Sequence, residues 1–121
     1  MEIGGLLPFI MLIDVLRLGA RVEFKARVVG TEFVTVLGRE ITGQVLHDAF
    51  QTANGLAAIE ACEAVVDEAC PRHCRISNPG DDRDFMLLDW AVFPLARDGV
   101  TIDQLIVAFA QTSPEPDGTA G

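Results

Sequence analysis

Basic residues are scarce in this chain: 9 Lys and Arg stand against 18 Asp and Glu, which gives a formal net charge of -9. No run of basic residues offsets that charge locally. Nucleic acids and anionic membrane surfaces are bound chiefly through Lys and Arg, so the composition excludes both as expected partners. Hydrophobic residues make up 50% of the chain, which predicts one packed domain.

A long apolar run is also missing. The longest apolar stretch, residues 6–18, contains Pro8, Asp14 and Arg17, whereas a transmembrane helix needs about 20 predominantly apolar residues. A secretory signal begins with basic residues, but Glu2 stands at the start here. These features predict a cytoplasmic protein in which residues 6–18 are part of the fold.

Cysteines are few, odd in number and irregularly spaced, at Cys62, Cys70 and Cys74, which argues against a disulfide scaffold. The stretch CPRHC, residues 70–74, brings two thiols and the imidazole of His73 together. A zinc site would need a fourth ligand. We therefore predict no metal site and expect Cys74 to face inward and His73 to face water, although metal binding by Cys70, His73 and Cys74 is left open.

Two strands are predicted before residue 30. Residues 7–18 form the first, and Gly19 suits the hairpin turn after it because glycine readily adopts positive φ. In the second strand apolar and charged residues alternate, which predicts one apolar and one charged face. The apolar set is Val22, Phe24, Ala26 and Val28, and the charged set is Glu23, Lys25 and Arg27.

Short helices are predicted to follow the second strand. Thr31 is placed to cap a helix that stops at Gly38, and Thr42 is placed to cap a second. Asn54 is placed to cap a long helix that Pro71 terminates. The apolar stripe predicted for the long helix comprises Leu56, Ile59, Cys62, Val65, Val66 and Ala69.

Three more strands are predicted beyond Pro71, at residues 73–77, 85–95 and 101–110, with a tight hairpin turn at Asp98-Gly99. The acidic stretch at residues 80–84 lacks the ligand spacing of a calcium loop and is interpreted as a solvated turn. The element order predicts an α+β domain, in which helices inserted between strands 2 and 3 cover one face of a five-stranded antiparallel sheet. We assign residues 1–110 to this domain and 111–121 to a flexible C-terminal tail.

Two segments, residues 22–46 and 93–110, resemble the PAS domain, and in particular the PAS-like family of alphaproteobacterial proteins of unknown role. The resemblance covers about residues 6–110. It departs from the family in having no Tyr, with Phe24 near the place where members often carry one, and in a shorter lead before the first strand. The dipeptides that carry it are Gly30-Thr31, Gly38-Arg39, Thr42-Gly43, Pro94-Leu95 and Asp98-Gly99.

The resemblance implies a sensory or protein-interaction module, for which we predict no catalysis of its own. We expect a homodimer or a signalling partner, because exposed sheet surface or edge strands need cover. The resemblance also implies that a small ligand can lie between the sheet and the helices. Short helices broken by glycine pack less densely over a sheet, and an apolar lining is usual for ligand pockets. The predicted lining residues are Phe33, Leu37, Leu46, Phe50, Ile59 and Trp90.

No cofactor is identified. Flavin photosensors of this fold use an Asn-Cys-Arg tripeptide, which the chain lacks, and Cys62 lies between Ala61 and Glu63. His47 could be considered as a haem ligand, but an exposed or capping role is favoured.

The alternative from another class is a small cone-like isomerase or hydrolase that uses a pocket carboxylate from Asp14, Asp89 or Asp103. Arg27 could face Asp14 across the first hairpin, either to recognise a carboxylate ligand or, as favoured, in a solvated pair. A purely structural dimerisation domain with a filled core is the third possibility.

Overall fold

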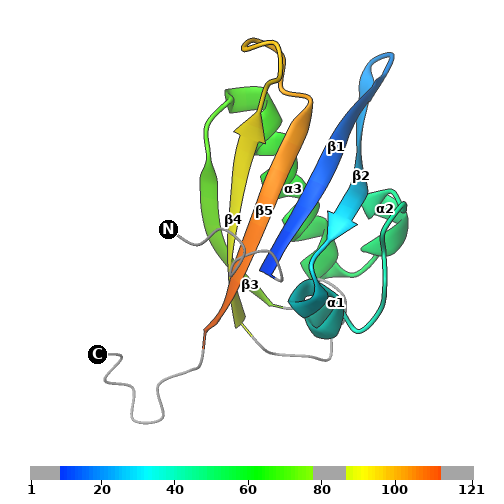
Figure 1. Cartoon of the computed structure of the whole chain (residues 1–121), viewed down its shortest axis with the longest axis vertical. Coiled ribbons are helices and arrows are strands. Elements are labelled where there is room, and N and C mark those ends of the chain that lie inside the picture. Colours follow the sequence, from blue (N-terminus) through cyan, green and yellow to red (C-terminus); the bar gives the residue numbers. More distant parts are fainter. Residues whose placement is uncertain (1–8, 78–86, 113–121) are drawn as a thin grey trace.

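The fold is described from a computed structural model of the chain, which describes residues 9–77 and 87–112, the last two by backbone only. Five strands form one antiparallel sheet in the order β2-β1-β5-β4-β3. Figure 1 shows the helices on one side of this sheet, with α3 behind it and α1 and α2 beside β2. The predicted fold class, five antiparallel strands with the helices inserted between strands 2 and 3, is confirmed.

The first hairpin joins β1 (Ile10–Leu18) to β2 (Arg21–Val29), and Gly19 adopts the predicted positive φ of 66° in its turn. The prediction that Val28 continues the apolar face is wrong. Leu12 pairs with Val28 but Ile13 pairs with Ala26, so a β-bulge leaves Arg27 as an extra residue. The bulge shifts the alternation, and Val28 is 55% exposed.

The second half of the sheet comprises β3 (Arg72–Ser77), β4 (Leu87–Leu95) and β5 (Gln104–Thr112). The predicted tight turn between β4 and β5 is wrong in length. Pairing ends at Leu95 and Gln104, so residues 96–103 form a longer connection. Gly99 turns it with a φ of 81°, and the Asp98 carboxylate accepts hydrogen bonds from the backbone N–H groups of Val100 (2.8 Å) and Thr101 (2.7 Å).

Some sequence predictions lie outside the described residues: the solvated turn at 80–84, the start of the fourth strand at 85 and 86, and the tail from 113 onward. The last strand extends to Thr112, two residues into the segment assigned to the tail.

The three helices are α1 (Thr31–Leu37), α2 (Leu46–Ala49) and α3 (Ala53–Glu68). All three predicted caps are wrong by one to three residues. The N-cap residues are Gly30, Val45 and Thr52, and only the Thr52 side chain makes a capping bond, accepting from the Gly55 N–H at 2.9 Å. Thr31 and Asn54 are already helical, and Thr42 instead donates from its N–H and hydroxyl to the Glu40 carboxylate.

The buried face of α3 is rotated from the predicted stripe. Leu56 is 46% exposed and Ala69 is exposed, whereas the small residues Ala58 and Ala61 are buried, which brings the helix backbone close to the sheet. The helix ends before Pro71, where Ala69 adopts a φ of 55°. No helix within the described ranges is long and apolar enough to span a membrane.

The core lies between the helices and one side of the sheet, here named the covered face. Residues of β1, β4 and β5 that point to this face alternate with partly exposed residues on the opposite side, here named the outer face. The strand residues of the core are Met11, Ile13, Val15, Phe24, Ala26, Leu88, Trp90, Val92, Leu105, Val107 and Phe109.

Candidate functional site

The structure brings together the six residues predicted to line a ligand cavity. They come from α1, from α2 and the residue that follows it, from α3 and from β4, and each is at most 4% exposed. They are continuous with the hydrophobic core beneath the short helices. This set, named the inner cluster, is Phe33, Leu37, Leu46, Phe50, Ile59 and Trp90.

Three aromatic rings meet at the centre of the inner cluster. Phe33 packs edge-on against Trp90, with ring centroids 5.5 Å apart and planes at 86°. It also contacts Phe109 of β5, at a centroid separation of 4.5 Å. The sequence analysis did not include Phe109 in this group. Phe109 lies on the same buried face of β5 as Leu105 and Val107, two residues beyond Val107.

Among the described residues, Trp90 carries the one buried side-chain nitrogen or oxygen atom that lacks a hydrogen-bond partner. Its side chain is 0% exposed, and Nε1 has no hydrogen-bond acceptor. A buried donor left without a partner costs about 1–3 kcal/mol. Buried Trp N–H groups usually have a partner, so this one needs an explanation.

The backbone of the connector between α1 and α2 adopts positive φ at residues 38 and 43, and this conformation favours glycine at both positions. Gly38 ends α1 with a φ of 81°, and Gly43 turns the chain with a φ of 87°, both in the left-handed region. The Gly43 N–H then donates to the Ala26 carbonyl (2.7 Å), and the Ala26 N–H donates to the Gln44 carbonyl (2.9 Å). The connector is thereby held against the free edge of β2.

Two further contacts order this connector. The Arg39 guanidinium donates to the Ala49 carbonyl at the end of α2. The Thr42 hydroxyl and N–H donate to the Glu40 carboxylate, and these hydrogen bonds hold the pKa of Glu40 below its usual value. The short helices are therefore positioned by local hydrogen bonds as well as by the core.

Two surface cavities flank α3, and neither is lined by the inner cluster. The larger, about 350 Å³, lies between α3 and β3 and is lined by Ala57, Glu60, Ala61, Arg72, Cys74 and Ile76. The smaller, about 240 Å³, lies between α3 and the β1–β2 hairpin and is lined by Ala20, Val22, Glu63, Val66 and Asp67. Glu63 and Asp67 border the smaller cavity without a basic residue, which makes it a poor site for anions, whereas Glu60 and Arg72 at the larger cavity carry opposite charges.

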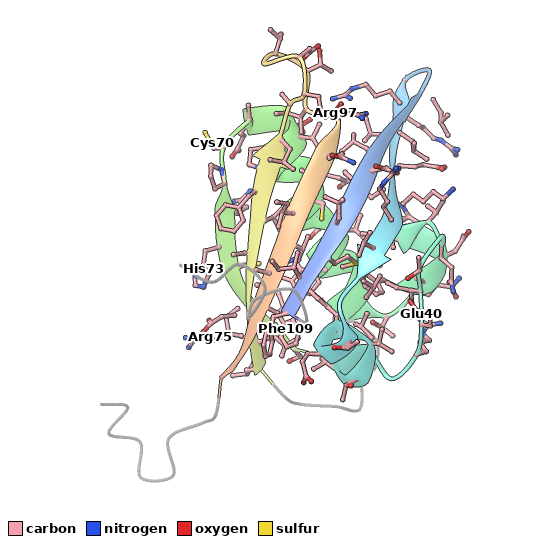
Figure 2. The ribbon with its side chains drawn as sticks, in the orientation of Figure 1. Glu40, Cys70, His73, Arg75, Arg97 and Phe109 are labelled. Carbon is pink, nitrogen blue, oxygen red and sulfur yellow. The ribbon has the colours of Figure 1, made fainter. Side chains whose placement is uncertain are left out.

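The cysteines and His73 do not converge. Cys74 points toward the helices from β3, while its neighbour His73 is exposed on the outer face, and Figure 2 shows Cys70 well apart from His73. Burial raises the pKa of Cys62 to about 12 and also raises that of Cys74, so both remain protonated thiols at neutral pH. Within the described ranges no group of three metal-ligating side chains is found. His47, considered as a haem ligand, is exposed on α2.

The three carboxylates of the enzyme alternative lie on or beside the outer face, each next to an arginine. The nearest nitrogen-oxygen distances are 3.0 Å for Arg27–Asp14, 3.2 Å for Arg75–Asp89 and 2.7 Å for Arg97–Asp103. Figure 2 shows Arg75 and Arg97 projecting from the two ends of this sheet. None of the three carboxylates lines either cavity.

Asp14 and Arg27 face each other across the first hairpin as predicted, and the pair is solvated. Gln104 Nε2 also donates to Asp14 at 3.0 Å, and this bond, together with Arg27, holds the pKa of Asp14 below its usual value. The Arg27 side chain is 59% exposed, so it is not a buried recognition site for a ligand carboxylate.

This sheet order and helix placement form an α+β fold that is also found in solved structures of light-oxygen-voltage domains. A light-oxygen-voltage domain studied with a flavin analogue superposes with a TM-score of 0.65 at 11% identity, over 92% of this chain and 81% of that one. The light-state domain of the blue-light photoreceptor Aureochrome1 gives 0.65 at 12% identity, over 92% and 86%. The Rhodobacter sphaeroides light-oxygen-voltage protein gives 0.64 at 11% identity, over 89% and 61%.

These similarities concern the fold. No protein-family model matches the chain, and no curated protein matches it in sequence. None of the three cysteines of this chain lies in α1, α2 or their connector.

Proposed function

We propose that this domain is a PAS-like sensory or protein-interaction module that binds a small, mostly apolar ligand within the inner cluster and carries out no catalysis. The fold supports this proposal because it places two short helices, the first of which ends at Gly38, over an apolar sheet face. The observation that carries it is the unpartnered Trp90 N–H at the centre of an otherwise apolar region. The carboxylates needed by the enzyme alternative lie on the other side of the sheet.

Ligand retention is tested by mass spectrometry of the purified chain. Under native conditions we expect a mass in excess of the polypeptide, which is lost on denaturation and recovered as a small apolar molecule. Protein that has lost its ligand in purification should bind indane, a compact hydrocarbon, and gain thermal stability. A bare polypeptide mass combined with no response to indane would contradict the proposal.

We further propose that the partner of the outer face is a second copy of this chain. The face exposes apolar side chains, including Phe93 at 43% and Leu95 at 36%. The Asp–Arg pairs neutralise each other within the chain, so they would not repel their copies across the two-fold axis of a dimer. The exposed acidic residues of α3, such as Glu60 and Glu63, lie on the helix side and would not face each other in such a dimer.

Sedimentation equilibrium tests the dimer. Ile106 lies on the outer face, paired with Leu12 and Phe93, so Ile106→Lys should convert a dimer to a monomer at the same concentration. Val100→Lys is the matched control, because Val100 is 83% exposed in the β4–β5 connection away from the face. A wild-type monomer at high concentration, or equal dissociation by both variants, would contradict a dimer through this face.

Two finer assignments belong to the same proposal. The PAS-like family of alphaproteobacterial proteins is supported by the dipeptides at residues 30–31, 38–39, 42–43, 94–95 and 98–99. A cytoplasmic location is supported by the acidic composition and by three free cysteines.

A further inference from the structure

The indole N–H of Trp90 has no hydrogen-bond partner, and the neighbouring side chains that the structure identifies carry no oxygen. Along the sheet Trp90 pairs with Cys74 of β3 on one side and Phe109 of β5 on the other. Phe33 packs against it from α1. These neighbours present a thiol and two phenyl rings, so an acceptor for the N–H would have to come from something other than their side chains.

We propose that Trp90 Nε1 donates a hydrogen bond to an oxygen of the bound ligand, which is therefore an apolar molecule with one neutral acceptor, such as a ketone or ester carbonyl. This inference rests on the proposed function and specifies the ligand's chemistry. An indole N–H donates and cannot accept, so the ligand atom must be an acceptor. A single such bond in an apolar site orients a small ligand.

The acceptor is neutral because the covered face offers no counter-charge. Every described Lys and Arg is exposed, and the guanidinium groups of Arg27, Arg75 and Arg97 are paired with carboxylates at the outer face. A ligand carboxylate beside Trp90 would be buried without a cation, at a large desolvation cost. A carbonyl ligand is therefore expected beside Trp90, and a free fatty or aromatic acid is not.

Entry requires movement of the short helices rather than of the sheet. α1 has 7 residues and α2 has 4, and helices of this length are marginal without tertiary contacts. They are joined by a connector with positive-φ glycines at both Gly38 and Gly43. Their separation would open the inner cluster while the strand ladder stays intact.

The test uses a matched pair of probes, 1-indanone and indane, which share a hydrocarbon body and differ by one carbonyl oxygen. Binding is measured by isothermal titration calorimetry. We expect 1-indanone to bind the wild-type chain about 3- to 10-fold more tightly than indane, as one added hydrogen bond predicts. In Trp90→Phe the two affinities should become equal, because the donor is gone. The ratio is the readout, since the smaller ring also changes cavity size for both probes.

A second measurement needs no variant. The chain has one Trp, so a ¹H–¹⁵N spectrum contains one indole N–H signal. We expect 1-indanone, but not indane, to move this proton downfield and slow its exchange with solvent. Equal responses to the two probes, as expected for an N–H directed at the Phe33 ring or bound to a trapped water, would overturn the inference.

The outcomes separate the two proposals. If both probes bind wild type equally and the ratio is unchanged in Trp90→Phe, the hydrogen bond is refuted while the apolar site stands. If neither probe binds wild type, the ligand-binding proposal itself fails. Tighter binding of 1-indanecarboxylate than of 1-indanone would overturn the neutral-acceptor assignment.

Discussion

The covered face and the outer face of the sheet are formed by the same strands but differ in composition and exposure. In the part of the chain that the structure describes, the strand residues of the core are apolar, and Trp90 Nε1 is the one buried side-chain nitrogen or oxygen without a partner. The outer face carries both apolar residues, such as Leu12 and Ile106, and Asp–Arg pairs. The covered face therefore excludes water, whereas the outer face can contact either water or another protein surface.

The largest effect should come from removing a ring from one face and not the other. Phe24 is 0% exposed on the covered face of β2, and Phe93 is 43% exposed on the outer face of β4. We expect Phe24→Ala to lower the free energy of unfolding by about 3–5 kcal/mol, because it leaves a cavity. Phe93→Ala should cost about 1 kcal/mol or less.

The free energy of unfolding of both variants is measured by urea denaturation. The protein is kept dilute so that any dimer is dissociated. Similar losses for Phe24→Ala and Phe93→Ala would break the distinction between a core face and an outer face.

A smaller effect should come from stiffening the helical cover. Gly38 has a φ of 81° and open space around the position of a Cβ, so only backbone strain opposes a side chain there. Gly38→Ala should cost about 1–2 kcal/mol in the free energy of unfolding, which is the penalty of the left-handed region. Gly38→Asn, which tolerates that region better, should cost less. Equal costs measured by urea denaturation would mean that the connector does not hold this conformation.

The smallest effect should come from the Asp14 carboxylate on the outer face. Its pKa is lowered in the folded state by Gln104 and Arg27, so its contribution to stability is complete above the unfolded value near 3.8 and is lost as pH falls through the folded value. Asp14→Asn should therefore lower the free energy of unfolding by at most about 1 kcal/mol at pH 7. The difference from wild type should shrink below about pH 4.

Stability curves of the two proteins between pH 2 and pH 7 test this expectation. A gap that grows as the pH falls would contradict the sign of the pKa shift.

Periodicity predicted the strands well because two-residue alternation reports directly on which side is buried, as in β3 and β5. It failed at Val28, where the bulge at Arg27 breaks the alternation, since a bulge depends on pairing with β1. The caps were misplaced because Thr and Asn are both common N-cap residues, and the sequence does not show which of several near a helix start is the cap. In the structure Thr52 caps α3, and Asn54 lies inside it.

The inner cluster was predictable as an apolar group, and all six residues are buried. The orphaned donor was not predictable, because a lone Trp in an apolar strand is equally consistent with a satisfied N–H. The buried face of α3 was mispredicted because its small residues, Ala58 and Ala61, pack against the sheet in place of Leu56.

The isoleucine methyl spectrum during titration with 1-indanone tests the central claim most directly. Ile59 belongs to the inner cluster and is 2% exposed, whereas Ile10 and Ile106 lie on the outer face, each paired in the β1–β5 ladder. We predict that the Ile59 methyl signal shifts in a saturable manner while the Ile10 and Ile106 signals stay in place. Shifts confined to Ile10 and Ile106, with Ile59 unmoved, would contradict ligand binding at the covered face.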